Sequence, residues 1–150
     1  MDSIIIFCAK YLIYVVVLGS VVVVLVSPHR NRLALLAVVA LPVAYALARL
    51  AGAFFSHPQP FSVSGTEPLI PHIIDNAFPS DHTLIGGVFA SVAFLADRRV
   101  GIVLWVLALL VGVARVMAGL HYVVDILAAT LLAAGTVFVV YKTLRHVGLY

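Results

Sequence analysis

The sequence predicts an all-α integral membrane protein: a bundle of five transmembrane helices with an extracytoplasmic proline-rich loop. Three observations predict this fold class. Of the 150 residues, 64% are hydrophobic and only 10% are charged, too little polar surface to cover a soluble globule. The apolar residues fall into runs close to the ~20 residues that cross a bilayer. The basic residues gather at the ends of these runs. We expect one membrane-embedded domain over residues 1–150.

Five apolar runs follow one another along the chain, over residues 4–26, 33–56, 80–97, 100–117 and 121–141. No basic residue precedes the first run and no clear cleavage site follows it, so we expect a retained span rather than a signal peptide. The last two runs are separated only by Ala118-Gly119-Leu120. A glycine here suits the left-handed residue that commonly ends a helix.

One connection is long and rich in proline. Residues 57–79 contain five prolines, at positions 58, 60, 68, 71 and 79. Proline removes a backbone donor and clashes with the preceding turn, so this segment does not form a continuous helix. We expect an ordered cap or re-entrant loop at the membrane surface.

The basic residues predict the orientation of the bundle. One side of the five alternating runs carries Arg30, Arg32, Arg98, Arg99, Lys142 and Arg145, whereas the long loop on the other side has no Lys or Arg. The positive-inside rule places the basic side in the cytoplasm and the loop outside. This topology explains the net charge of +3 better than a nucleic-acid partner does. Cys8 is the only cysteine, which excludes an intrachain disulfide and a cysteine-based metal site.

A first group of reactive side chains lies at the break between the last two runs. Arg115, His121 and Asp125 are ionisable residues within apolar sequence, where charge is costly and therefore indicates function. His121 and Asp125 are four residues apart and share one helix face. We expect the Asp125 carboxylate to accept the imidazole Nδ1–H, which leaves Nε2 free as a nucleophile. Arg115 is a candidate anion ligand.

A second group opens the third run on the same outer side. Pro79 suits a first helical turn, and Ser80 and Asp81 are helix-capping residues. The free backbone N–H groups of such a turn form an anion site, and His82 lies beside it. Two histidines, an arginine and a helix N-terminus therefore converge at the outer surface. We expect neither a metal nor a cofactor.

In Pro79-Ser80-Asp81-His82 and in Arg115-x5-His121-x3-Asp125, the chain resembles the second and third motifs of the type 2 phosphatidic acid phosphatase superfamily. Within it, the chain is most similar to the bacitracin-resistance-type undecaprenyl pyrophosphate phosphatases, on the stretches 57–61, 69–72 and 119–122. The resemblance covers about residues 50–141.

The resemblance implies a reaction. His121 would attack the terminal phosphorus of undecaprenyl pyrophosphate and form a phosphohistidine that water hydrolyses. Asp125 would orient His121, and His82 would protonate the leaving oxygen. The phosphate oxygens would be bound by Arg115, Ser80, Gln59 and the backbone amide of Asp81. The substrate would be a polyprenyl diphosphate in the bacterial cytoplasmic membrane, where its hydrolysis recycles the carrier for cell-wall polymers, with Gly86 and Gly87 allowing close helix approach around the lipid tail.

The chain departs from this family pattern in three places. The Lys that opens the broad family's first motif has no clear counterpart here. The first motif of the family ends in Arg-Pro, whereas this chain has Gln59-Pro60; Gln59 still donates hydrogen bonds but brings no charge. The serine before the third-motif arginine is here Ala114. Arg49, inside the second run, is a candidate to supply the missing cation.

Two other functions fit the same residues. One is a phosphatase for another lipid phosphate, such as phosphatidate or phosphatidylglycerol phosphate. The other is a non-catalytic membrane protein that binds lipid phosphates. Phosphate release from a panel of lipid phosphates separates the three.

Overall fold

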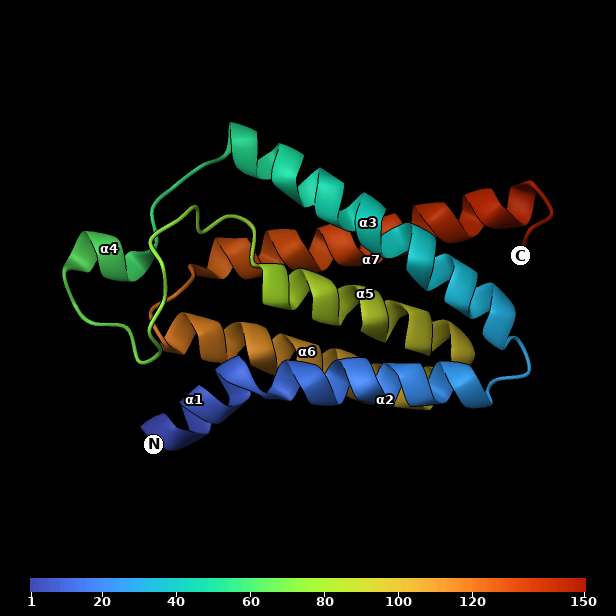
Figure 1. Cartoon of the computed structure of the whole chain (residues 1–150), viewed down its shortest axis with the longest axis horizontal. Coiled ribbons are helices and arrows are strands. Elements are labelled where there is room, and N and C mark those ends of the chain that lie inside the picture. Colours follow the sequence, from blue (N-terminus) through green and yellow to red (C-terminus); the bar gives the residue numbers. More distant parts are fainter.

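The computed structural model describes all 150 residues, and the fold is all-helical as predicted. Seven helices follow one another along the chain (Figure 1): α1 Asp2–Lys10, α2 Leu12–Val26, α3 Arg30–Phe54, α4 Pro60–Ser64, α5 Asp81–Ala96, α6 Arg98–Met117 and α7 Val123–His146. The only β contact is an isolated bridge between Pro58 and Asn76.

The long helices lie side by side and alternate in direction (Figure 1). The N-terminus, α4 and the α6–α7 turn lie at one end of the bundle, and the α2–α3 turn, the α5–α6 turn and the C-terminus lie at the other. The central helix is α5, which packs against α2, α3, α6 and α7. The two ends of the bundle therefore carry the segments that the sequence assigns to opposite membrane sides.

Three helices, α3, α6 and α7, are long and apolar enough to cross a membrane, and α1 with α2 makes a fourth if the bent pair counts as one span. The helix α5 has 16 residues. At 1.5 Å per residue it extends for about 24 Å, less than the ~30 Å of a bilayer core. By length alone, therefore, the structure supports up to four of the five predicted spans.

The first predicted span, 4–26, is not one straight helix. It breaks at Tyr11 into α1 and α2, which are bent by 41°. Because of the bend, α1 packs along the end of α6, where Ala9 is buried in one cluster with Ala114, Ala118 and Leu120. The gain of this contact offers a physical reason for the break, since no Pro or Gly lies at residue 11.

Small residues let the helices approach closely. The buried face of α3 repeats at intervals of three or four residues: Leu33, Leu36, Ala40, Ala44, Ala48 and Gly52. A Cβ atom built on Gly87 would lie 2.8 Å from Ala133 Cβ, and one on Gly86 would lie 3.3 Å from Ala108 Cβ. The predicted close approach at these two glycines is confirmed, although their neighbours are α2, α6 and α7 rather than a space for a lipid tail.

The end of α6 has the geometry that the sequence predicts. Gly119 has a φ of +79°, in the left-handed region. The Leu120 N–H donates to the Arg115 carbonyl at 3.1 Å and the Gly119 N–H to the Val116 carbonyl at 3.0 Å. This pair of bonds is the Schellman motif. It holds Arg115 in a fixed position in space relative to the residues that begin α7.

The proline-rich loop is ordered and covers the α6–α7 turn. The Phe61 N–H donates to the Gly119 carbonyl at 3.3 Å, and the Leu69 N–H to the Ala118 carbonyl at 3.2 Å. Its ends are joined where the Ala77 N–H donates to the His57 carbonyl at 3.0 Å. The loop contains one short helix, α4, which the sequence analysis did not predict.

Candidate active site

A small polar cavity lies at the end of the bundle where the loop, α3, α5 and α6 meet. Its volume is about 110 Å³, and it is lined by Arg49, His72, Asp75, Asn76, Pro79, Asp81, His82, Arg115 and His121. A single water molecule needs only ~10–15 Å³ by the same measure, so the cavity has room for a ligand of several atoms. His82, in the first turn of α5, and His121, in the turn between α6 and α7, thus line one space.

His121 is 6% exposed, and its ring orientation is set from the loop. Its Nδ1 lies 2.9 Å from the Ala77 carbonyl oxygen. A carbonyl only accepts hydrogen bonds, so Nδ1 carries the proton and Nε2 keeps its lone pair. The Asp125 carboxylate, the predicted partner of this N–H, lies beside it as well: its Oδ2 is 3.5 Å from Nδ1 and accepts the Tyr122 N–H at 2.8 Å. The first turn of α7 holds the carboxylate there.

Asp125 is completely buried and has a second imidazole beside it. His57 Nε2 lies 3.0 Å from Asp125 Oδ1, although the contact is not aligned as a hydrogen bond and Oδ1 has no other partner. His57 is not among the residues that the sequence predicts to act in the site. Its only signal was a place in the stretch 57–61, which reveals nothing about a carboxylate 68 residues further on.

Arg115 is buried but has no partner. It is 5% exposed, it makes no hydrogen bond or ion pair, and its Nε is buried without an acceptor. An uncompensated buried charge is strongly destabilising. A guanidinium held in this state on the wall of a cavity is a binding group for an anion, and its planar donor fork matches a phosphate.

The start of α5 supplies further groups to the cavity. The backbone N–H groups of Asp81, His82 and Thr83 donate no hydrogen bond within the protein, as is usual for a first helical turn. The Asp81 carboxylate pairs with the Arg49 guanidinium at 2.5 Å, and that guanidinium lies 4.9 Å from the centre of the Tyr45 ring. Arg49 lines the cavity, where it is a candidate to supply the missing cation.

Two predicted phosphate ligands lie outside the cavity. Gln59 is fully buried, where its Nε2 donates to Asp75 Oδ1 at 2.5 Å and its Oε1 accepts the Asp75 N–H at 3.0 Å. Ser80 is also fully buried, and its hydroxyl accepts a hydrogen bond from the Thr83 hydroxyl at 3.2 Å. The structure thus separates both side chains from His82, His121 and Arg115, and Gln59 braces the loop instead.

His72 also lines the cavity. It belongs to the loop, outside the helices, and its pKa is lowered from 6.5 by partial burial and by the positive charge of Arg115. His72 is therefore neutral at pH 7, so it adds no fixed charge to the cavity. No three His, Cys, Asp or Glu side chains are grouped to hold a metal ion.

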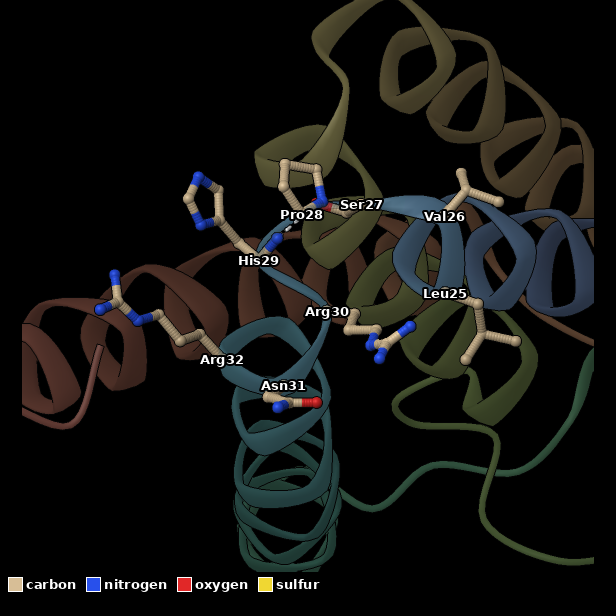
Figure 2. A pocket seen from close by; sticks show the side chains of 8 residues that line it. All are labelled: Leu25, Val26, Ser27, Pro28, His29, Arg30, Asn31 and Arg32. Carbon is tan, nitrogen blue, oxygen red and sulfur yellow. Dashed lines mark hydrogen bonds between the residues drawn. The ribbon is translucent and has the colours of Figure 1, made fainter.

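A larger hollow of about 620 Å³ lies at the opposite end of the bundle, at the α2–α3 turn. It is lined by Leu25 to Arg32, and the His29 N–H donates to the Ser27 hydroxyl at 3.2 Å. Figure 2 shows the side chains of His29, Arg30 and Arg32 spread apart around this turn. They converge on no common point, so this end offers basic charge rather than a reactive site.

The fold is an all-helical apolar bundle. One end of it holds two imidazoles, a buried carboxylate and a free guanidinium. The chain belongs to the PAP2 superfamily, whose sequence profile matches residues 33–148.

Individual relatives are similar over much of the chain. It is 37% identical over 145 residues to the bacitracin transport permease protein BcrC of Bacillus licheniformis, covering 95% of this chain and 71% of that protein. It is 40% identical over 80 residues to the undecaprenyl-diphosphatase BcrC of Bacillus subtilis, covering 53% of this chain and 41% of that protein. It is 37% identical over 134 residues to YbjG of Escherichia coli, covering 87% and 67%. No solved structure matches the chain.

Proposed function

We propose that this protein is an undecaprenyl pyrophosphate phosphatase of a bacterial cytoplasmic membrane that works through a phosphohistidine on His121. One observation carries the proposal: the buried, unpartnered Arg115 guanidinium shares a small cavity with the free Nε2 side of His121 and with His82. The undecaprenyl-diphosphatase activity named for the Bacillus subtilis relative supports the choice of substrate.

The proposed reaction has two displacements at phosphorus. First, His121 Nε2 attacks the terminal phosphorus, the bond from phosphorus to the bridging oxygen breaks, and His82 gives a proton to that oxygen as undecaprenyl phosphate leaves. Water then attacks the phosphorus of the phosphohistidine and gives a proton to His82, the P–N bond breaks, and inorganic phosphate leaves. Asp125 stabilises the positive charge of the phosphorylated ring.

Stabilisation of the phosphoryl oxygens is the main electrostatic task in such a transfer. We assign it to the Arg115 guanidinium, to the free N–H groups at Asp81 and His82, and to Arg49. Arg49 would thereby replace the arginine that the family carries where this chain has Gln59. Its pair with Asp81 keeps that carboxylate from repelling the substrate.

We also propose that the whole chain is one domain with five spans. The span that the length criterion leaves out is α5. This helix is short, but α2, α3, α6 and α7 pack around it. The end with the basic turns would face the cytoplasm, and the cavity and the loop 57–79 would face outward. The substrate would then meet the site in the outer leaflet.

The test is phosphate release by the purified protein from a panel of undecaprenyl pyrophosphate, phosphatidate and phosphatidylglycerol phosphate, without added metal. We expect the highest kcat/KM for undecaprenyl pyrophosphate, and no release by His121→Ala. His29→Ala, at the opposite end of the bundle, is the matched control and should keep the wild-type rate. A preference for another lipid phosphate would reassign the substrate, and the absence of any release would leave a lipid-phosphate-binding protein.

A further inference from the structure

His57 is the histidine beside the site that does not line the cavity. Its side chain is 32% exposed, but Nδ1 is buried without a partner and Nε2 lies 3.0 Å from Asp125 Oδ1. The centre of its ring lies 5.3 Å from that of Tyr122 and 5.9 Å from that of Phe78, so aromatic neighbours hold it on two sides. The ring is thus directed at the carboxylate rather than at the phosphate space.

The contacts of His57 form a closed circuit with the proposed nucleophile. The His57 carbonyl accepts the Ala77 N–H at 3.0 Å, and the Ala77 carbonyl accepts the His121 Nδ1–H at 2.9 Å. The same Nδ1 lies 3.5 Å from Asp125 Oδ2, and Asp125 Oδ1 lies beside His57 Nε2. His57 therefore contacts both of the residues that face Nδ1 of His121, Ala77 and Asp125.

The chemistry of the contact defines the tautomer of His57. A carboxylate only accepts, so the nitrogen that faces Oδ1 carries the proton. Oδ1 is the carboxylate oxygen without another partner, and it is buried, where an unpaired oxygen is costly. Hydrogen bonds at reacting sites are often misaligned before substrate binds and tighten afterwards. With Oδ1 held by His57, Oδ2 stays toward the imidazole that becomes positive on phosphorylation.

We infer that His57 is a positioning residue for phosphoryl transfer: its Nε2–H holds the buried Asp125 carboxylate against the back of His121, without contact to the phosphate. This inference rests on the proposed function. The Nδ1 side of His121 is then faced by a pair of side chains, His57 and Asp125, and not by the Asp125 carboxylate alone.

The test compares three substitutions by steady-state kinetics with undecaprenyl pyrophosphate. His57→Leu removes the donor, His57→Asn moves it out of reach, and His57→Gln offers an N–H at nearly the distance of Nε2. We expect kcat to fall by about 10- to 100-fold in the first two at unchanged KM, the value of a hydrogen bond to a charged group, and to recover in His57→Gln. The control His29→Leu should keep the wild-type kcat. A wild-type kcat in His57→Leu, or an equal loss in all three, would overturn the inference.

A second measurement needs no variant and no turnover. Nitrogen NMR of the histidine rings in the wild-type protein should show His57 protonated at Nε2 and His121 protonated at Nδ1. A His57 protonated only at Nδ1 would overturn the inference whatever the activity. If His57 is protonated at Nε2 and His121 at Nδ1, but the wild-type protein releases no phosphate from any lipid, the proposed function fails. The pairing of His57 with Asp125 is then still supported.

Discussion

At the scale of single residues, the unpartnered charge of Arg115 is the feature that most distinguishes this site from a structural polar network. A network that only held helices together would satisfy its own donors. Here Arg115 is 5% exposed and its side chain bonds to nothing, whereas the neighbouring Arg49, Asp81, Asp75 and Gln59 are all paired. The fold therefore leaves this guanidinium free to bind an anion.

Replacement of Arg115 separates function from stability. We predict that Arg115→Leu lowers phosphate release about 10²- to 10³-fold, as loss of one transition-state donor does elsewhere. Its melting temperature should stay equal to that of the wild type or rise, because an unpaired buried charge is removed. The measurements are the kcat of purified protein and its thermal unfolding. A lower melting temperature at full activity would contradict the assignment of Arg115 as a substrate ligand.

Arg49 is the second residue whose role is open to a direct test. We predict that Arg49→Leu raises KM about tenfold, an effect of roughly 1.4 kcal/mol, while kcat changes less. The expected effect is modest because the Arg49 side chain is 51% exposed and solvent screens its charge. Arg32→Leu, at the other end of the bundle, is the control. Unchanged KM in Arg49→Leu would make Arg49 an interface anchor.

Motif spacing alone predicted that His82, Arg115 and His121 belong to one site. It did not predict the loop groups that contact this site. His82, Arg115 and His121 lie next to helix ends, and helix ends can be placed from apolar run lengths and from Gly119. The Ala77 carbonyl and His57 reach the site through the path of the proline-rich loop. Proline counts predict that such a loop is irregular, not where its backbone groups point, so these contacts were missed.

At the scale of elements, the loop 57–79 acts as a scaffold as well as a cover. It supplies the carbonyl that holds His121 and the cavity residues His72, Asp75 and Asn76. Its own shape depends on the two hydrogen bonds between Gln59 and Asp75. Replacement of the family arginine by glutamine thus brings a bracing contact that the sequence analysis had read as a phosphate contact.

Loss of that brace should loosen the loop. We predict that Gln59→Ala destabilises the folded loop by about 1–3 kcal/mol, because the Asp75 carboxylate and N–H lose their partners. Faster proteolytic cleavage within residues 57–79 and faster amide exchange are the readouts. Thr66→Ala, in the exposed part of the same loop, serves as the matched control. Equal cleavage of the two variants would show that Gln59 does not brace the loop.

The ends of the long helices were predicted more closely than the break within the first predicted span. The run lengths predicted α3, α5, α6 and α7 to within a few residues at most ends, because apolar length is the dominant signal in a bilayer. The break at Tyr11 has no local sequence signal. It accompanies the packing of α1 on α6, a tertiary effect that no window of local sequence contains.

At the scale of the whole molecule, the bundle has two chemically different ends. One holds the cavity and a loop without Lys or Arg; the other holds the turns with Arg30, Arg32, Arg98 and Arg99. We predict that Ile73→Cys, in the loop, reacts with a membrane-impermeant maleimide in intact cells, in a Cys8→Ala background. His29→Cys should react only after the cells are opened. The reverse pattern would place the site in the cytoplasm and exclude the proposed topology.

The most direct test of the account is to trap the covalent intermediate. Purified protein mixed briefly with undecaprenyl pyrophosphate labelled in its terminal phosphate, and then quenched in alkali, should carry label that acid removes, because a phosphohistidine is acid-labile. We predict this label on the wild-type protein and none on His121→Ala. Two results would contradict a phosphohistidine on His121. One is a wild-type protein that turns over rapidly with no label at any quench time, and the other is a His121→Ala variant that still releases phosphate.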